Sequence, residues 1–182
     1  WQFIPSTGKQ YDLSQNWWVD NRRDVVQSTR AALDYLQTIY EMHGNDWFLA
    51  LASYNWGEGA VGRAVKRNRA LGKPADYLSL SMPTETRHYI PKLIALKHIV
   101  LRADELGLLL PALPDKPYFV TIEKTRAGFA MPDLDTPLVA QKEKFYLERP
   151  DYLQRMFDRG SRYLHHIVEE IEKRGMPTEL AL

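Results

Sequence analysis

Three glutamates stand where an acid-base group could act: Glu58 in "WGEGA", Glu85 in "PTETRHY" and Glu179 in "MPTELAL". A glutamate works as a general acid when a cleft raises its pKa toward the working pH. Each position also has a structural interpretation. Glu58 and Glu179 fall at predicted helix starts, where a negative charge is favourable, and Glu85 can cap a helix. For Glu179 and Glu58 we favour the helix-start interpretation. For Glu85 the residue types leave both interpretations open.

Polar groups also gather at the end of a predicted buried helix. Tyr54 and Asn55 close the apolar run "NDWFLALASYN" directly before a glycine turn, which places them at a cleft edge. Trp1 and Trp56 could stack on a ligand or belong to the core. Trp17 and Trp18 are neighbours that point apart, so we expect at most one of them to be buried.

The pattern of apolar residues predicts a mainly α protein. We expect helices from Asp20 or Asp24 to Gly44, from Asn45 or Asp46 through 55, over 60–70, over 83–106 with Pro91 as a kink or a break, and from Pro150 to Gly175. Between the last two we expect a Pro-rich stretch, a strand-like "YFVTI" (118–122) and an irregular 125–141. "MPTELAL" reads as the first turn of another helix.

Composition excludes several classes of protein. Lys and Arg number 24 and Asp and Glu 23, a balance that gives no support for nucleic-acid binding. There is no Cys, and the five His show no ligand spacing, so we predict no metal and no cofactor. No run of about 18 apolar residues is present, so we predict no transmembrane segment.

Three motifs in order, "WQFIPSTGKQYDL", "LASYNWGEGAV" and "PTETRHYIPKLIALKHI", resemble the catalytic domain of the lytic murein transglycosylases. The resemblance implies a helical domain of the goose-type lysozyme kind, and it covers residues 1–124, with a Pro-rich extension from about 107. Residues 125–182 resemble the segment that precedes this domain in the family and leads into the catalytic helix. The order is therefore permuted, with a seam near Lys124 and Thr125, within one compact domain.

This order implies that a short stretch is missing between Leu182 and Trp1. In the family that stretch carries the catalytic glutamate, so the resemblance implies that no residue of this chain is that acid. Two explanations stay open. Two segments of a longer chain are numbered consecutively with a loop left out, or the chain is a circular permutant from which the loop was excised.

The resemblance implies a peptidoglycan lyase of the periplasm, anchored to the outer membrane through a segment not present here. Such an enzyme cleaves the β-1,4 bond between N-acetylmuramic acid and N-acetylglucosamine with one glutamate and leaves a 1,6-anhydro end. The resemblance assigns glycan strands as partner and assigns substrate binding to Gln2, Tyr54, Asn55, Glu85 and Tyr89. Two other hypotheses remain: a glycan-binding module of the same fold that does not cleave, and a helical interaction domain with no glycan role.

Overall fold

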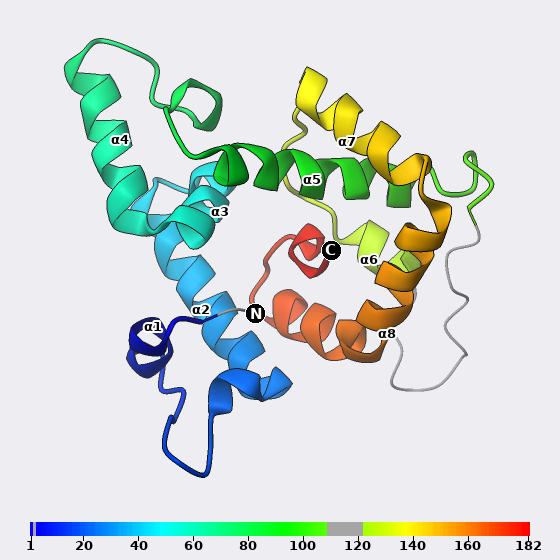
Figure 1. Cartoon of the computed structure of the whole chain (residues 1–182), viewed down its shortest axis with the longest axis horizontal. Helices are drawn as coiled ribbons and strands as arrows, with labels where there is room; N and C mark the ends of the chain where they lie inside the picture. Colours follow the sequence, from blue (N-terminus) through cyan, green and yellow to red (C-terminus); the bar gives the residue numbers. More distant parts are fainter. Residues whose placement is uncertain (2, 109–121) are drawn as a thin grey trace. The chain divides into compact units, whose positions relative to one another are not determined.

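A computed structural model of the chain describes residues 1, 3–108 and 122–182, and these residues are mainly helical (Figure 1). Within these ranges there is no β-strand, only an isolated bridge between Gln15 and Asp20. The predicted mainly α class is therefore confirmed. Apart from Ile122, the strand-like stretch 118–122 lies outside the described residues.

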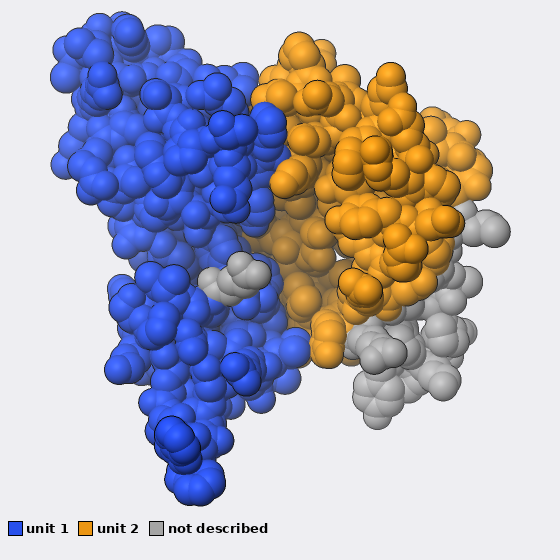
Figure 2. Space-filling model, viewed as in Figure 1, with its two compact units in different colours: residues 1–90 blue, residues 91–182 orange. Residues whose placement is uncertain are grey.

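The chain forms two compact units, Trp1–Ile90 and Pro91–Leu182, coloured separately in Figure 2. The boundary falls inside the helix α5 (Thr84–Leu101), which continues through Pro91. It does not fall at Lys124–Thr125, where the change of family segment was expected and where the helix α6 (Ile122–Ala127) runs without a break. The permuted order of segments stays a prediction.

Unit 1 contains longer helices where helices were predicted: α2 (Val25–Met42), α3 (Trp47–Trp56), α4 (Glu58–Ala70) and the first turns of α5. It also contains the short elements α1 (Pro5–Gln10), η1 (Asn21–Arg23) and η2 (Tyr77–Ser79), of which α1 and η2 were not predicted. α3 packs against both α2 and α4. The apolar stripe of α2 is fully buried at Leu33, Leu36 and Ile39, so this helix supplies much of the core.

Side-chain caps fix where these helices begin. Both aspartates proposed for the first long helix are caps: the carboxylate of Asp20 accepts from Arg22 N at the start of η1, and that of Asp24 accepts from Gln27 N at the start of α2. Asp46 caps α3 by accepting from the backbone N of Phe48 and Leu49. α3 ends at Gly57, whose φ of 94° is open to glycine and strained for other residues.

The segment between α1 and η1 carries Trp17 and Trp18. At most one of them was expected to be buried, and both are exposed, at 89% and 88%, which agrees with that expectation. The side chain of Asn16 accepts from the backbone N of Trp18 and Val19, and Asn16 N donates to Val19 O. This tight turn keeps both indoles away from the core of unit 1.

Unit 2 contains the rest of α5, α6, α7 (Pro137–Leu147), α8 (Pro150–Lys173) and the 3-10 turn η3 (Thr178–Ala181). The irregular stretch predicted for 125–141 is wrong at both ends, because α6 extends to Ala127 and α7 begins at Pro137. The side chain of Thr136 caps α7 by accepting from Val139 N. η3 lies against α6 and α8, as the red turn in Figure 1 shows.

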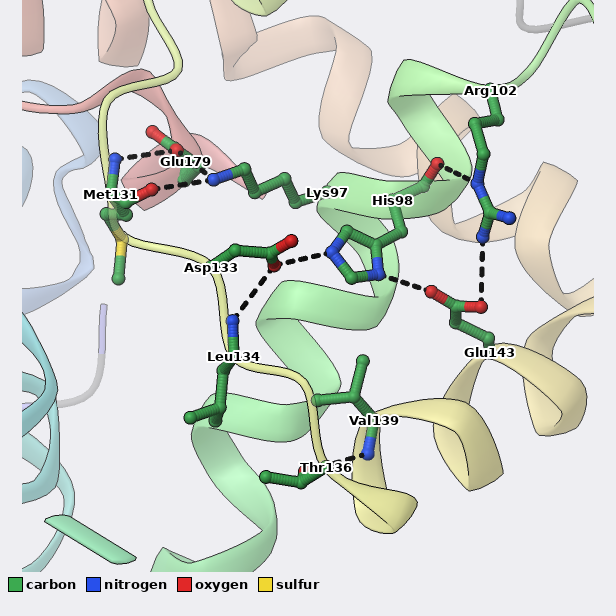
Figure 3. A network of polar contacts seen from close by, with 10 residues as sticks. All are labelled: Lys97, His98, Arg102, Met131, Asp133, Leu134, Thr136, Val139, Glu143 and Glu179. Carbon is green, nitrogen blue, oxygen red and sulfur yellow. Dashed lines mark hydrogen bonds and ion pairs between the residues drawn. The ribbon is translucent and has the colours of Figure 1, made fainter.

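A polar network joins α5 to the later elements of unit 2 (Figure 3). Glu179, fully buried, forms an ion pair with Lys97 at 3.1 Å and accepts from the backbone N of Ala130 and Met131. One helical position further on, both ring nitrogens of His98 meet carboxylates: Nε2 lies 2.6 Å from Asp133, and Nδ1 contacts Glu143. These contacts tie the loop 128–136 and α7 to α5.

We expect acid to weaken unit 2 through Glu170 on α8. Hydrogen bonds from Arg174 and Lys173 to this buried carboxylate lower its pKa from 4.5 to about 2, although burial opposes the shift. Because the folded-state pKa is the lower one, this stabilisation is present above pH 4.5 and is lost as the pH falls toward 2. The loss is at most about 3 kcal/mol. Urea unfolding of the wild type and of Glu170→Gln across this range measures it. A variant whose pH dependence matches that of the wild type would contradict the assignment.

Candidate functional site

A cavity of about 410 Å³ opens in unit 1 where α1, α2, α3 and the start of α4 meet. It is lined by Phe3, Ile4, Thr7, Tyr35, Tyr54, Asn55, Trp56, Gly57 and Glu58. The lining combines aromatic rings with a few polar groups, as pockets for uncharged ligands usually do. Two of the predicted site residues, Tyr54 and Asn55, are therefore side by side in one cavity.

Asn55 is held by a residue from a distant helix. Its Oδ1 accepts a hydrogen bond of 2.7 Å from Thr86 Oγ1, and Thr86 is buried in the first turns of α5. The phenol of the buried Tyr77 donates to the backbone oxygens of Thr86 and Arg87, which fixes this part of α5. The amide Nδ2 of Asn55 is then the end of the side chain that can donate to a ligand.

An aromatic cluster forms one wall of the site. Tyr54 makes an edge contact with Trp1, with ring centroids 6.3 Å apart, and it packs against Tyr35 at 5.7 Å. Trp1 is anchored because its Nε1 donates to Thr29 Oγ1 at 2.7 Å. Tyr11 extends the cluster beside Tyr35 at 5.3 Å. Aromatic surfaces of this kind suit stacking on the apolar faces of sugar rings.

Glu58 is the one glutamate of the three candidates that lines this cavity. It is exposed at the first turn of α4, and its Oε2 accepts a hydrogen bond of 2.5 Å from Tyr35 Oη. Burial, together with this carboxylate, raises the pKa of Tyr35 well above its usual range, so the phenol keeps its proton and remains the donor. Both interpretations of Glu58 are therefore compatible with its position.

The other predicted residues are placed differently. Gln2 lies outside the described residues. Glu85 is exposed in the first turn of α5, and Tyr89, whose pKa is raised by burial, is half-buried one turn after Thr86. Neither lines the cavity described above, and their part in substrate binding stays a prediction. Glu179 belongs to unit 2, in the first turn of η3 as expected, and its carboxylate is fully engaged there.

Thr86 and Tyr35 were not predicted as site residues from the sequence. Thr86 carries a usable signal, since it shares a helix face with Ile90 and Ile94 at spacings of four residues, so a hydroxyl interrupts an apolar stripe. Such a buried hydroxyl needs a partner. Tyr35 lies beside the stripe of α2, and nothing local indicates that it reaches Glu58.

Comparison with known proteins defines the class of this helical, cavity-bearing unit. Residues 1–76 match the family model described as "Transglycosylase SLT domain". The resemblance inferred from the motifs is thereby confirmed.

Particular relatives agree with the family. The chain is 49% identical over 111 residues to membrane-bound lytic murein transglycosylase D of Escherichia coli strain K12, a match that covers 61% of this chain and 25% of that protein. The same figures hold for the protein of that name from strain CFT073. A protein of Alteromonas sp. (strain M-1) named for tributyltin chloride resistance is 36% identical over 74 residues, which cover 41% of this chain and 36% of that protein. The chain spans about a quarter of the length of the first two relatives.

Among the described residues, no helix has the length and apolarity needed to cross a membrane.

Proposed function

We propose that this chain is the glycan-binding part of a peptidoglycan lytic transglycosylase. The proposed enzyme protonates the oxygen of the β-1,4 bond between N-acetylmuramic acid and N-acetylglucosamine, and the bond from muramic C1 to this oxygen breaks, so that N-acetylglucosamine leaves with a free 4-hydroxyl. The same group then accepts the proton of the muramic C6 hydroxyl, and that oxygen bonds to C1 to close a 1,6-anhydro ring. No water is consumed, so a single carboxylate serves for both proton transfers and no second carboxylate is needed.

The single observation that carries this proposal is the cavity next to Asn55 in a transglycosylase SLT domain. The amide of Asn55, oriented by Thr86, can donate to the acetamido oxygen of an N-acetyl sugar. The aromatic wall formed by Trp1, Tyr54 and Tyr35 offers ring faces or edges to a pyranose. Both features favour a glycan over a charged small molecule in this cavity.

We propose further that the acid-base glutamate comes from a segment that precedes Trp1 in the natural protein. The environment of Glu179 argues against it as the acid-base glutamate, because its carboxylate already binds Lys97 and two backbone N–H groups inside unit 2. Glu58 is the alternative within this chain, since it lines the cavity. Because peptidoglycan lies outside the cytoplasmic membrane, the proposal places the activity in the periplasm, with outer-membrane anchoring through a segment not present here.

Incubation with purified peptidoglycan sacculi tests the proposal, with cosedimentation and mass spectrometry of the released muropeptides as readouts. We expect the full-length protein to release 1,6-anhydro muropeptides, and the 182-residue chain to cosediment without releasing them. If the 182-residue chain itself releases 1,6-anhydro muropeptides and Glu58→Gln abolishes this release, the acid-base glutamate is Glu58. Cosedimentation without release by the full-length protein would support the non-catalytic binding module, and absence of cosedimentation would exclude both.

A further inference from the structure

A second cavity, of about 470 Å³, lies within unit 1 and also has Trp56 in its lining. It runs along α4 and the segment that follows it, and it is lined by Trp56, Ala60, Arg63, Ala64, Arg67, Asn68, Leu71, Lys73, Ser79 and Ser81. Trp56 lines the first cavity as well, so the two cavities are neighbours that share this residue. A ligand held in the first cavity can therefore extend a substituent into the second.

Cations dominate the charge of this second cavity. Arg63 and Arg67 are four residues apart on α4 and so share one helix face, and Lys73 joins them from the next segment. All three side chains are exposed, and among the described residues none of them forms an ion pair or a side-chain hydrogen bond. The net charge of the chain is only +1, so three such cations around one cavity are a local excess of positive charge, which favours an anionic ligand.

The wall opposite α4 is fixed before any ligand binds. Asn68 Nδ2 donates to Pro74 O at 2.7 Å and to Ser79 O at 3.0 Å, and Lys73 N donates back to Asn68 O at 2.9 Å. The carboxylate in this segment, Asp76, accepts from the backbone N and the hydroxyl of Ser79, so it is occupied as a cap. A preorganised wall of this kind lowers the entropic cost of binding.

We propose that this cavity binds carboxylates of the peptide stem that peptidoglycan carries on its N-acetylmuramic acid residues. The inference rests on the proposed function, which puts the glycan in the neighbouring cavity. The glycan backbone is largely uncharged, whereas the stem carries several carboxylates and branches from the sugar. Arginine forms paired hydrogen bonds with carboxylates, and two arginines on one helix face can hold two such groups. The cavity then makes the domain selective for strands that keep their stems.

Isothermal titration calorimetry with two soluble probes tests this inference: the N-acetylglucosaminyl-N-acetylmuramyl tetrapeptide and the same disaccharide without its peptide. The second probe keeps only the lactyl carboxylate. We expect the first to bind about tenfold more tightly, an advantage that shrinks as salt is raised. The double variant Arg63→Gln, Arg67→Gln should remove that advantage and leave the affinity for the peptide-free probe unchanged. Lys66→Gln with Arg69→Gln is the matched control, since both residues are exposed cations of α4 that do not line the cavity.

The outcomes separate the two proposals. Equal affinity of the wild type for both probes overturns the stem site and leaves the glycan site standing. Equal losses for both probes in the Arg63 and Arg67 variant also overturn it, because the lactyl carboxylate would then be the ligand. If the control variant also loses the tighter binding of the tetrapeptide probe, that preference comes from general charge attraction, and the assignment of the stem site to this cavity is overturned. If neither probe binds the wild type, the proposed function fails and the stem site fails with it.

Discussion

Replacement of Glu179 by alanine is expected to lower the free energy of unfolding by about 3–5 kcal/mol, the range observed when one partner of a buried ion pair is removed. The carboxylate is fully buried, and it faces Lys97 Nζ at 3.1 Å, with the Lys97 side chain only 10% exposed. Without it, the ammonium of Lys97 keeps, among the described residues, the carbonyl of Met131 as its hydrogen-bond acceptor, at 2.7 Å. The backbone N–H groups of Ala130 and Met131 lose their acceptor at the same time.

Urea unfolding measures this loss, and Glu172→Ala is the matched control. Glu172 pairs with Lys124 at 2.7 Å, but both side chains are partly exposed, at 37% and 50%. Removal of an exposed pair costs at most about 1 kcal/mol. Hydrogen exchange adds a local readout, because the amides of Ala130 and Met131 should exchange faster in Glu179→Ala and not in the control. Similar losses in the two variants would show that Glu179 is not the buried anchor of unit 2.

Replacement of Asn55 by alanine is expected to weaken binding of an N-acetylglucosamine oligomer by about tenfold, which corresponds to about 1.4 kcal/mol. The variant removes the amide that we propose donates to the sugar, and it leaves the aromatic wall in place. Calorimetric titration of the 182-residue chain with the oligomer measures the effect. The unfolding free energy, measured in parallel, shows whether the protein remains folded.

Thr86 provides the companion test, because it does not line the cavity and acts through Asn55. Thr86→Val keeps the shape of the side chain and removes the hydrogen bond, so we expect binding to weaken by about fivefold. Thr86→Ser keeps the hydroxyl and should restore affinity. If Thr86→Val binds like the wild type while Asn55→Ala does not, the orientation of Asn55 does not depend on Thr86. If Thr86→Ser stays as weak as Thr86→Val, the effect comes from packing.

The helices of this protein follow from local patterns in the sequence. Asp24 and Asp46 begin their helices because a capping carboxylate needs only the backbone N–H groups two or three residues ahead. Gly44 and Gly175 follow the ends of α2 and α8 because each takes a positive φ, which is unfavourable for other residues. Helix α7 was not predicted. Its start carries a capping residue, Thr136 before Pro137, but this cap lies in the stretch "MPDLDTP" (131–137), whose turn residues favoured an irregular segment.

In the candidate site, too, some features follow from local sequence and others depend on tertiary packing. Local order alone put Tyr54 and Asn55 at the end of a buried helix, and the structure places both in a cavity. Only the tertiary structure pairs Asn55 with Thr86, 31 residues away, and Glu58 with Tyr35, 23 residues away. It also gives Glu179, which the sequence placed correctly in a first helical turn, its acceptor role 48 and 49 residues from its backbone donors. Caps and turns act within a few residues and can be deduced from the order of residues, whereas these pairings depend on how the helices pack.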